Sequence, residues 1–201
     1  MCHIVSNYEH HAPPHRVGHQ WFEEAMCETA SLYTLRRFSA TWGESPPRME
    51  WAPYAPSLHR YTEQVVNEPH RRLPENTTLA AWFRENEPAL RDNPYLRDRN
   101  EVVANQLLPI LERNPGSWEA IGFLNLDVPD GETSFQEYLQ QWYRRVPLQH
   151  RQFIRQTLGL FQLAAPDAGD ESLAHTEARP TTPDRTIAAE PSIGAAGSTT
   201  R

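Results

Sequence analysis

Two side chains near the start of the chain are of types that bind zinc, namely the imidazole of His3 and the carboxylate of Glu24. A catalytic zinc site uses three protein ligands and keeps one position for a water molecule, which the metal activates for hydrolysis. Twenty residues separate His3 from Glu24, enough for one helix to end, for a turn at Pro13 and Pro14, and for a second helix to return antiparallel. The spacing therefore allows both ligands to meet at one point.

The sequence around these two residues resembles a known pattern. Cys2-His3 looks like the second half of the H-E-x-x-H helix of zinc peptidases, in which two histidines four residues apart share one helical face. Trp21-Phe22-Glu23-Glu24 looks like the next helix, which supplies the third ligand. Further matching segments are Ser6-Asn7-Tyr8-Glu9 and Ala30-Ser31-Leu32-Tyr33. The chain from His3 to about Phe161 thus resembles a gluzincin-like metallopeptidase domain.

This resemblance implies that His3 and Glu24 bind Zn²⁺ and that the domain hydrolyses a peptide or protein substrate with a metal-activated water. The first His ligand and the general-base Glu of the motif have no counterpart in the chain. We therefore expect a fragment or mis-started form that is inactive as given and that holds Zn²⁺ weakly through two ligands. The alternative is a non-catalytic helical module that binds a partner protein.

The acidic residues of the second helix also have a simpler explanation. Glu23, Glu24 and Glu28 could be side chains of a first helical turn, where the helix dipole favours negative charge. This explanation is strongest for Glu23. It is weaker for Glu24 and Glu28, because they lie four residues apart on one helical face together with Ser31.

Further histidines between the two expected helices offer a second metal-binding hypothesis. These are His10, His11, His15 and His19. Imidazoles suit Zn²⁺ and Ni²⁺, but the spacing matches no known finger, and Pro13 and Pro14 preclude a continuous helix. We interpret this stretch mainly as a polar surface loop with weak adventitious metal binding.

Composition limits the remaining function classes. The chain has 201 residues, 38% hydrophobic content and six Trp, which suffice for one domain with its own core. Its net charge of −7 includes no basic cluster, so nucleic-acid binding is not expected. Two cysteines are too few for a disulfide framework. No run of apolar residues is long enough to span a membrane.

Hydrophobic periodicity is helical almost throughout and predicts an all-α, compact multi-helix domain. The expected helices cover 20–42, 55–66, 79–91, a stretch from 93–94 to 112, 117–124, 135–145 and 148–163. The aromatic residues Trp42, Trp51, Tyr54 and Tyr61 are expected to lie in the core. Residues 1–163 would form the metallopeptidase-like domain, and 164–201, rich in Pro, Ala, Gly, Ser and Thr, a disordered tail.

Overall fold

The structure, a computed structural model, describes residues 5–7, 18–126 and 133–166, and within these residues it contains helices and no strand. The α-helices are α2 (Gln20–Thr41), α3 (Ala55–Val66), α4 (Leu79–Asp92), α5 (Arg97–Arg113), α6 (Phe135–Arg145) and α7 (Leu148–Leu160). The 3₁₀ helices are η2 (Met49–Tyr54), η3 (Pro69–Arg71) and η4 (Pro115–Phe123). The predicted all-α fold is confirmed for this part of the chain. The predicted disordered tail falls almost wholly on residues 167–201, outside the described residues.

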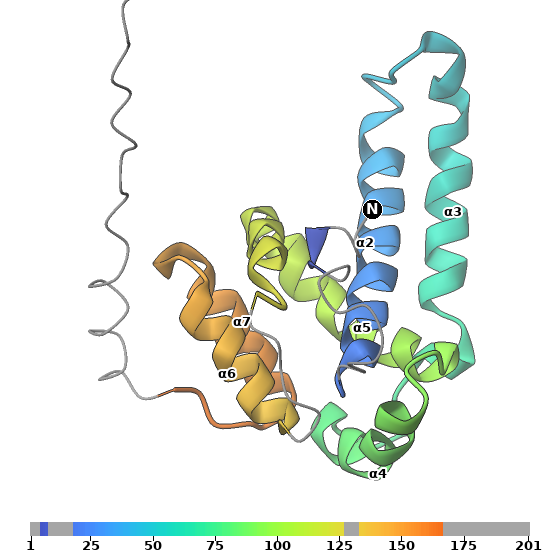
Figure 1. The fold of residues 1–201 in the computed structure, drawn as a ribbon. Coiled ribbons are helices and arrows are strands. Elements are labelled where there is room, and N and C mark those ends of the chain that lie inside the picture. Colours follow the sequence, from blue (N-terminus) through green and yellow to red (C-terminus); the bar gives the residue numbers. More distant parts are fainter. Residues whose placement is uncertain (1–4, 8–17, 127–132, 167–201) are drawn as a thin grey trace, which may run out of the picture.

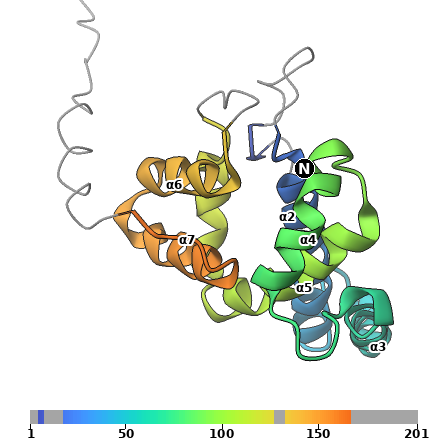
Figure 2. The same cartoon turned by 90° about the horizontal axis from the view of Figure 1, so that it is seen from below.

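Helix α2 lies at the centre of the helix packing. It packs along both α5 and α3. Figure 1 shows α2 and α3 as a long hairpin that extends past the other helices, while α6 and α7 pack together beside α5. Seen from below in Figure 2, α2, α4 and α5 lie close together and α6 and α7 form a separate pair. The first turn of α2 therefore lies inside the helical assembly and its last turns lie outside.

An aromatic cluster fixes that first turn. Trp21 is fully buried, and its ring centroid lies 4.8 Å from that of Phe135 in α6 and 5.3 Å from that of Phe83 in α4. Phe135 in turn lies 5.0 Å from Phe161, just after α7. Such ring contacts add to the free energy gained by burying large apolar side chains. Residues that follow Trp21 in α2 are thereby held in a defined orientation.

The predicted helix boundaries are confirmed closely for α3 and α6 and nearly so for α2 and α4. The prediction was wrong at the start of α5, which begins at Arg97 because the Asn93 side chain accepts a hydrogen bond from the Tyr95 backbone N–H and closes a turn. Pro88 and Pro109 lie inside α4 and α5 and end neither helix. The segment 117–124 is a 3₁₀ rather than an α-helix.

A capping box formed by Ser134 and Glu137 opens α6. The Ser134 hydroxyl accepts from the Glu137 backbone N–H, and the Glu137 carboxylate accepts from the Ser134 backbone N–H at 3.0 Å. We expect Ser134→Ala to lower the free energy of unfolding by about 1 kcal/mol, as for other lost N-caps. Urea unfolding measures this loss. Thr133→Ala, which leaves the box intact, serves as the control, and an equal loss in both variants would contradict the assignment.

The expectation that four aromatic residues belong to the core was wrong. Trp51, Tyr54 and Tyr61 are 38%, 59% and 55% exposed, and Trp42 is only half-buried. The end of α2 and η2, which carry Trp42, Trp51 and Tyr54, belong to the protruding tip of the α2–α3 hairpin (Figure 1). Tyr61 lies farther along α3 and lines a surface pocket. Trp42 packs instead against the neighbouring rings of Phe38 and Trp51, at centroid distances of 4.8 and 5.2 Å. In the described residues, no helix is both long and apolar enough to cross a membrane.

Candidate functional site

Glu23 and Glu24 are neighbours in α2, but their side chains lie in different environments. Glu23 is buried, with 1% of its surface exposed. Glu24 lines a pocket of about 260 Å³ between α2 and the start of α5. The other lining residues are Cys27, Glu28 and Ser31 from α2, with Tyr95, Arg97, Asn100 and Glu101. The predicted common face of Glu24, Glu28 and Ser31 is thus confirmed, since all three line one pocket.

A larger pocket of about 430 Å³ adjoins the first. Four residues line both pockets, namely Glu28, Ser31, Arg97 and Glu101. The larger one continues along α2 to α3 and η3, where its lining includes Tyr61, Glu68, His70 and Arg71. Together the two pockets form a depression with mixed polar and apolar lining along one side of α2.

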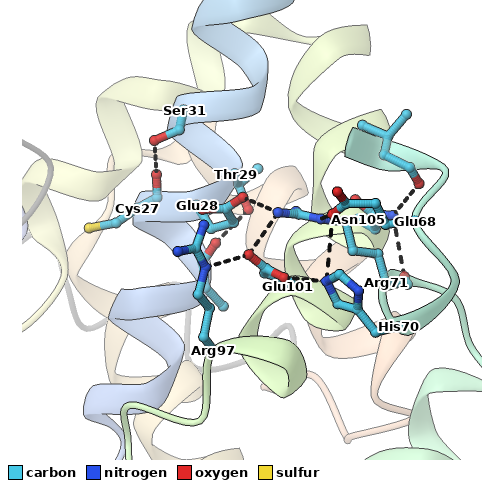
Figure 3. Close-up of polar contacts among 12 residues, drawn as sticks. Cys27, Glu28, Thr29, Ser31, Glu68, His70, Arg71, Arg97, Glu101 and Asn105 are labelled. Atoms are coloured by element: carbon cyan, nitrogen blue, oxygen red, sulfur yellow. Dashed lines mark hydrogen bonds and ion pairs between the residues drawn. The ribbon is translucent and has the colours of Figure 1, made fainter. Parts of the chain in front are cut away.

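A buried arginine organises the floor of the larger pocket (Figure 3). Arg71 Nη2 lies 2.9 Å from Glu28 Oε1 and 2.7 Å from Glu101 Oε1, and Arg71 Nε lies 3.1 Å from Glu68 Oε2. Its side chain is only 3% exposed. Asn105 of α5 fixes the position of the segment from the end of α3 to η3, because it donates hydrogen bonds to the backbone oxygens of Val66 and Arg71. One guanidinium therefore connects α2, η3 and α5.

Glu101 divides its two oxygens between different partners. Oε1 accepts from Arg71 and from Arg97, each at 2.7 Å, whereas Oε2 lies 2.6 Å from Nε2 of His70. Burial alone would raise the pKa of Glu101. Hydrogen bonds from Arg97 and His70 and the charge of Arg71 outweigh burial and lower the pKa below its ordinary value. Glu101 is therefore an anion in a nearly closed environment.

Glu23 lies in the first turn of α2, as the simpler explanation of this residue expects, but its hydrogen-bond partners come from distant parts of the chain. Its Oε2 accepts from the Ser6 hydroxyl at 3.3 Å, and its Oε1 accepts from Asn125 Nδ2 at 2.8 Å. The same Asn125 amide donates to the Ser6 backbone oxygen, and the Tyr138 hydroxyl donates to Asn125 Oδ1. Burial raises the pKa of Glu23 to about 7, despite the hydrogen bonds from Asn125 and Ser6. Glu23 is therefore a buried carboxyl of the first turn that ties Ser6 to α2.

Asn7 strengthens this attachment of the N-terminal segment. Its side-chain amide donates to the backbone oxygens of Gly122 and Leu124 at 3.1 and 2.9 Å. The chain at residues 6 and 7 is thus fixed between α2 and the end of η4. The spacing at 19, 22, 23 and 26 places Glu23 within the buried arc of α2, and this is the signal that could have identified it.

His19 also differs from its prediction as part of a polar surface loop. It is 1% exposed, and its Nε2 lies 2.7 Å from the Thr133 backbone oxygen, which it donates to as a neutral ring. Burial lowers the pKa of His19 to about 4, with a further contribution from the charge of Arg91. The other proposed ligands His3, His10, His11 and His15 lie outside the described residues. The structure therefore places Glu24 but not the histidine expected to join it.

The chain matches no protein-family model, no curated protein and no solved structure. What the site can do is therefore argued from its own geometry.

Proposed function

We propose that the pocket beside Glu24 is a zinc site of a gluzincin-like metallopeptidase-type domain, with Glu24 as the carboxylate ligand and His3 as the imidazole ligand. The observation that carries this proposal is the different placement of two adjacent glutamates. Glu24 lines the pocket, while Glu23 is turned inward and holds Ser6. A carboxylate and an imidazole are both ligands that suit Zn²⁺.

The attachment of Ser6 supports the pairing of His3 with Glu24. Ser6 is hydrogen-bonded to the residue that directly precedes Glu24. Ser6 follows His3 by only three residues in the sequence, and a chain segment this short has a limited reach of about 10 Å, which supports the pairing. We infer that the buried Glu23–Asn125 pair positions the segment that carries the proposed ligand.

The ion pair between Glu28 and Arg71 disfavours Glu28 as the ligand. Glu28 is already bound to Arg71 at 2.9 Å, and breaking that contact would leave a guanidinium that is 3% exposed with one partner fewer. Zn²⁺ bound at this site would supply a Lewis acid that activates water for attack on a peptide bond. Arg97, which lines the same pocket and is largely exposed, offers guanidinium hydrogen-bond donors to a substrate carbonyl or carboxylate.

Metal titration of single-site variants tests this assignment. We expect Glu24→Gln and His3→Ala each to weaken Zn²⁺ binding by about tenfold or more, because each removes one direct ligand. Competition with a chromophoric chelator measures the affinity. Glu85→Gln is the matched control, since Glu85 is an exposed glutamate of α4 that does not line the pocket, and the affinity of this variant should remain close to that of the parent chain. Equal losses from Glu85→Gln and Glu24→Gln, or none from Glu24→Gln, would refute the proposal.

A helical interaction module is the second candidate, and the exposed aromatic tip of the α2–α3 hairpin favours it. The most exposed apolar side chains there are Met49 at 77%, Tyr54 at 59% and Trp51 at 38%. Clustered apolar side chains at a surface are typical of protein-binding sites. If this candidate is correct, binding of a partner protein will survive Glu24→Gln and will weaken in Trp51→Ala.

A further inference from the structure

A second group of metal-ligand side chains lies in the larger pocket, away from Glu24. Glu68 directly precedes η3, His70 lies within it, and Glu101 projects from α5. One ligand atom from each of the three lies within 4.8 Å of the others. His70 Nε2 lies 2.6 Å from Glu101 Oε2 and 3.7 Å from Glu68 Oε2 (Figure 3). All three residues line the pocket of about 430 Å³.

We propose that Glu68, His70 and Glu101 form a divalent-metal site, with Zn²⁺ as the best-suited ion. One imidazole and two carboxylates make three protein ligands, and the pocket leaves room for water or a small ligand at the fourth position. This site does not depend on the function proposed for Glu24. The two sites share no ligand, so each can fail without the other.

Two of the ligand-atom distances show what adjustment the ion requires. Tetrahedral zinc with bonds of about 2.0–2.2 Å sets neighbouring ligand atoms about 3.4 Å apart. The Glu68–His70 distance of 3.7 Å is already close to this value, and the His70–Glu101 distance of 2.6 Å must lengthen. His70 can supply this movement, because its side chain is 38% exposed and lies on a three-residue 3₁₀ segment.

The arginines of the network are compatible with a metal at this point. Both arginine contacts to Glu101 fall on Oε1, so its Oε2 is directed at His70. Arg71 and Arg97 therefore hold the Glu101 carboxylate through the oxygen that does not face His70, and Arg71 Nε also lies 3.1 Å from Glu68 Oε2, so both carboxylates have arginines as outer partners. The carboxylates of Glu28, Glu68 and Glu101 exceed the two guanidiniums by one negative charge, and this excess favours a cation.

Binding also defines the tautomer of His70. The ion takes the place of the hydrogen between Nε2 and Glu101 Oε2, and the ring of a neutral His70 then carries its proton on Nδ1. Zinc coordination therefore leaves a characteristic signature on one identified ring nitrogen, even in the unaltered chain. This signature separates a metal site from a purely structural ion-pair network, which needs no metal.

Zn²⁺ titration of the full chain, monitored through the histidine ring nitrogens by NMR, provides the test. We expect the Nε2 signal of His70 to shift at saturation, and His70→Gln or Glu68→Gln to weaken this binding event by more than about 100-fold, since loss of outer partners alone costs 10–100-fold. His59→Gln and Glu85→Gln are matched controls, because both residues are exposed helical positions outside the cluster.

The Glu24→Gln variant distinguishes the two proposed sites, because it should leave the His70 shift unchanged. A circular-dichroism spectrum of each variant checks that the fold is intact. Absence of Zn²⁺ binding, an unshifted His70 ring at saturating Zn²⁺, or equal affinity in His70→Gln and His59→Gln would overturn the proposal.

Discussion

Replacing Arg71 with methionine is expected to destabilise the protein by about 3–5 kcal/mol, the range found when one partner of a buried ion pair is removed. Methionine preserves much of the length of the side chain but none of its charge. Glu101, which is 4% exposed and 2.7 Å from Arg71, would lose a buried counterion, and Glu28 and Glu68 would each lose a contact. Because the network connects α2, η3 and α5, the loss should affect global unfolding.

Arg36→Met provides a matched control for this prediction. Arg36 also contacts two glutamates, Glu112 at 2.9 Å and Glu63 at 3.2 Å, but its side chain is 31% exposed. Pairs of this kind contribute about 0–1 kcal/mol because water screens the charges. Urea unfolding of both variants at neutral pH measures the difference. A loss in Arg71→Met no greater than that in Arg36→Met would show that the network does not support the fold.

The helices were predictable because their signals are local in sequence. Thr78 and Ser134 cap the first turns of α4 and α6, and Pro56 occupies the first turn of α3, where its missing N–H is tolerated. The common face of Glu24 and Glu28 was predictable for the same reason, since residues four apart in a helix are neighbours. Each of these signals is contained within a few residues.

The polar contacts of the site could not be predicted, because they join residues far apart in the chain. Glu23 bonds to Asn125 over 102 positions, and His70 meets Glu101 over 31. The spacing along α2 places Glu23 in the buried arc of the helix, but no local signal identifies its distant partner Asn125. The prediction that the aromatic residues of the hairpin tip are buried was wrong for a related reason. Their burial depends on whether another helix covers the hairpin.

Glu23 and His19 lead to the second prediction with a large expected effect, because burial shifts their pKa values in opposite directions. In the folded protein the pKa of Glu23 rises from 4.5 to about 7, and the pKa of His19 falls from 6.5 to about 4. Both side chains are 1% exposed. Each shift corresponds to about 3 kcal/mol of pH-dependent stability.

The two contributions have opposite signs over nearly the same pH range. Between pH 4.5 and 7, folded Glu23 keeps a proton that the unfolded chain releases, so its contribution to stability falls as pH rises. Between pH 4 and 6.5, unfolded His19 binds a proton that the folded chain excludes, so its contribution falls as pH drops. In the parent chain the two slopes should largely cancel.

Single variants should reveal separately how each group changes the free energy of unfolding with pH. Glu23→Gln, which resembles the protonated carboxyl, leaves His19 alone, so stability should increase by about 3 kcal/mol from pH 4 to 6.5 relative to the double variant. His19→Gln leaves Glu23 alone, and stability should decrease by a similar amount from pH 4.5 to 7. Urea unfolding across this range, with Glu23→Gln/His19→Gln as the reference, measures both slopes. Slopes of equal sign in the two single variants would show that burial does not shift these groups in opposite directions.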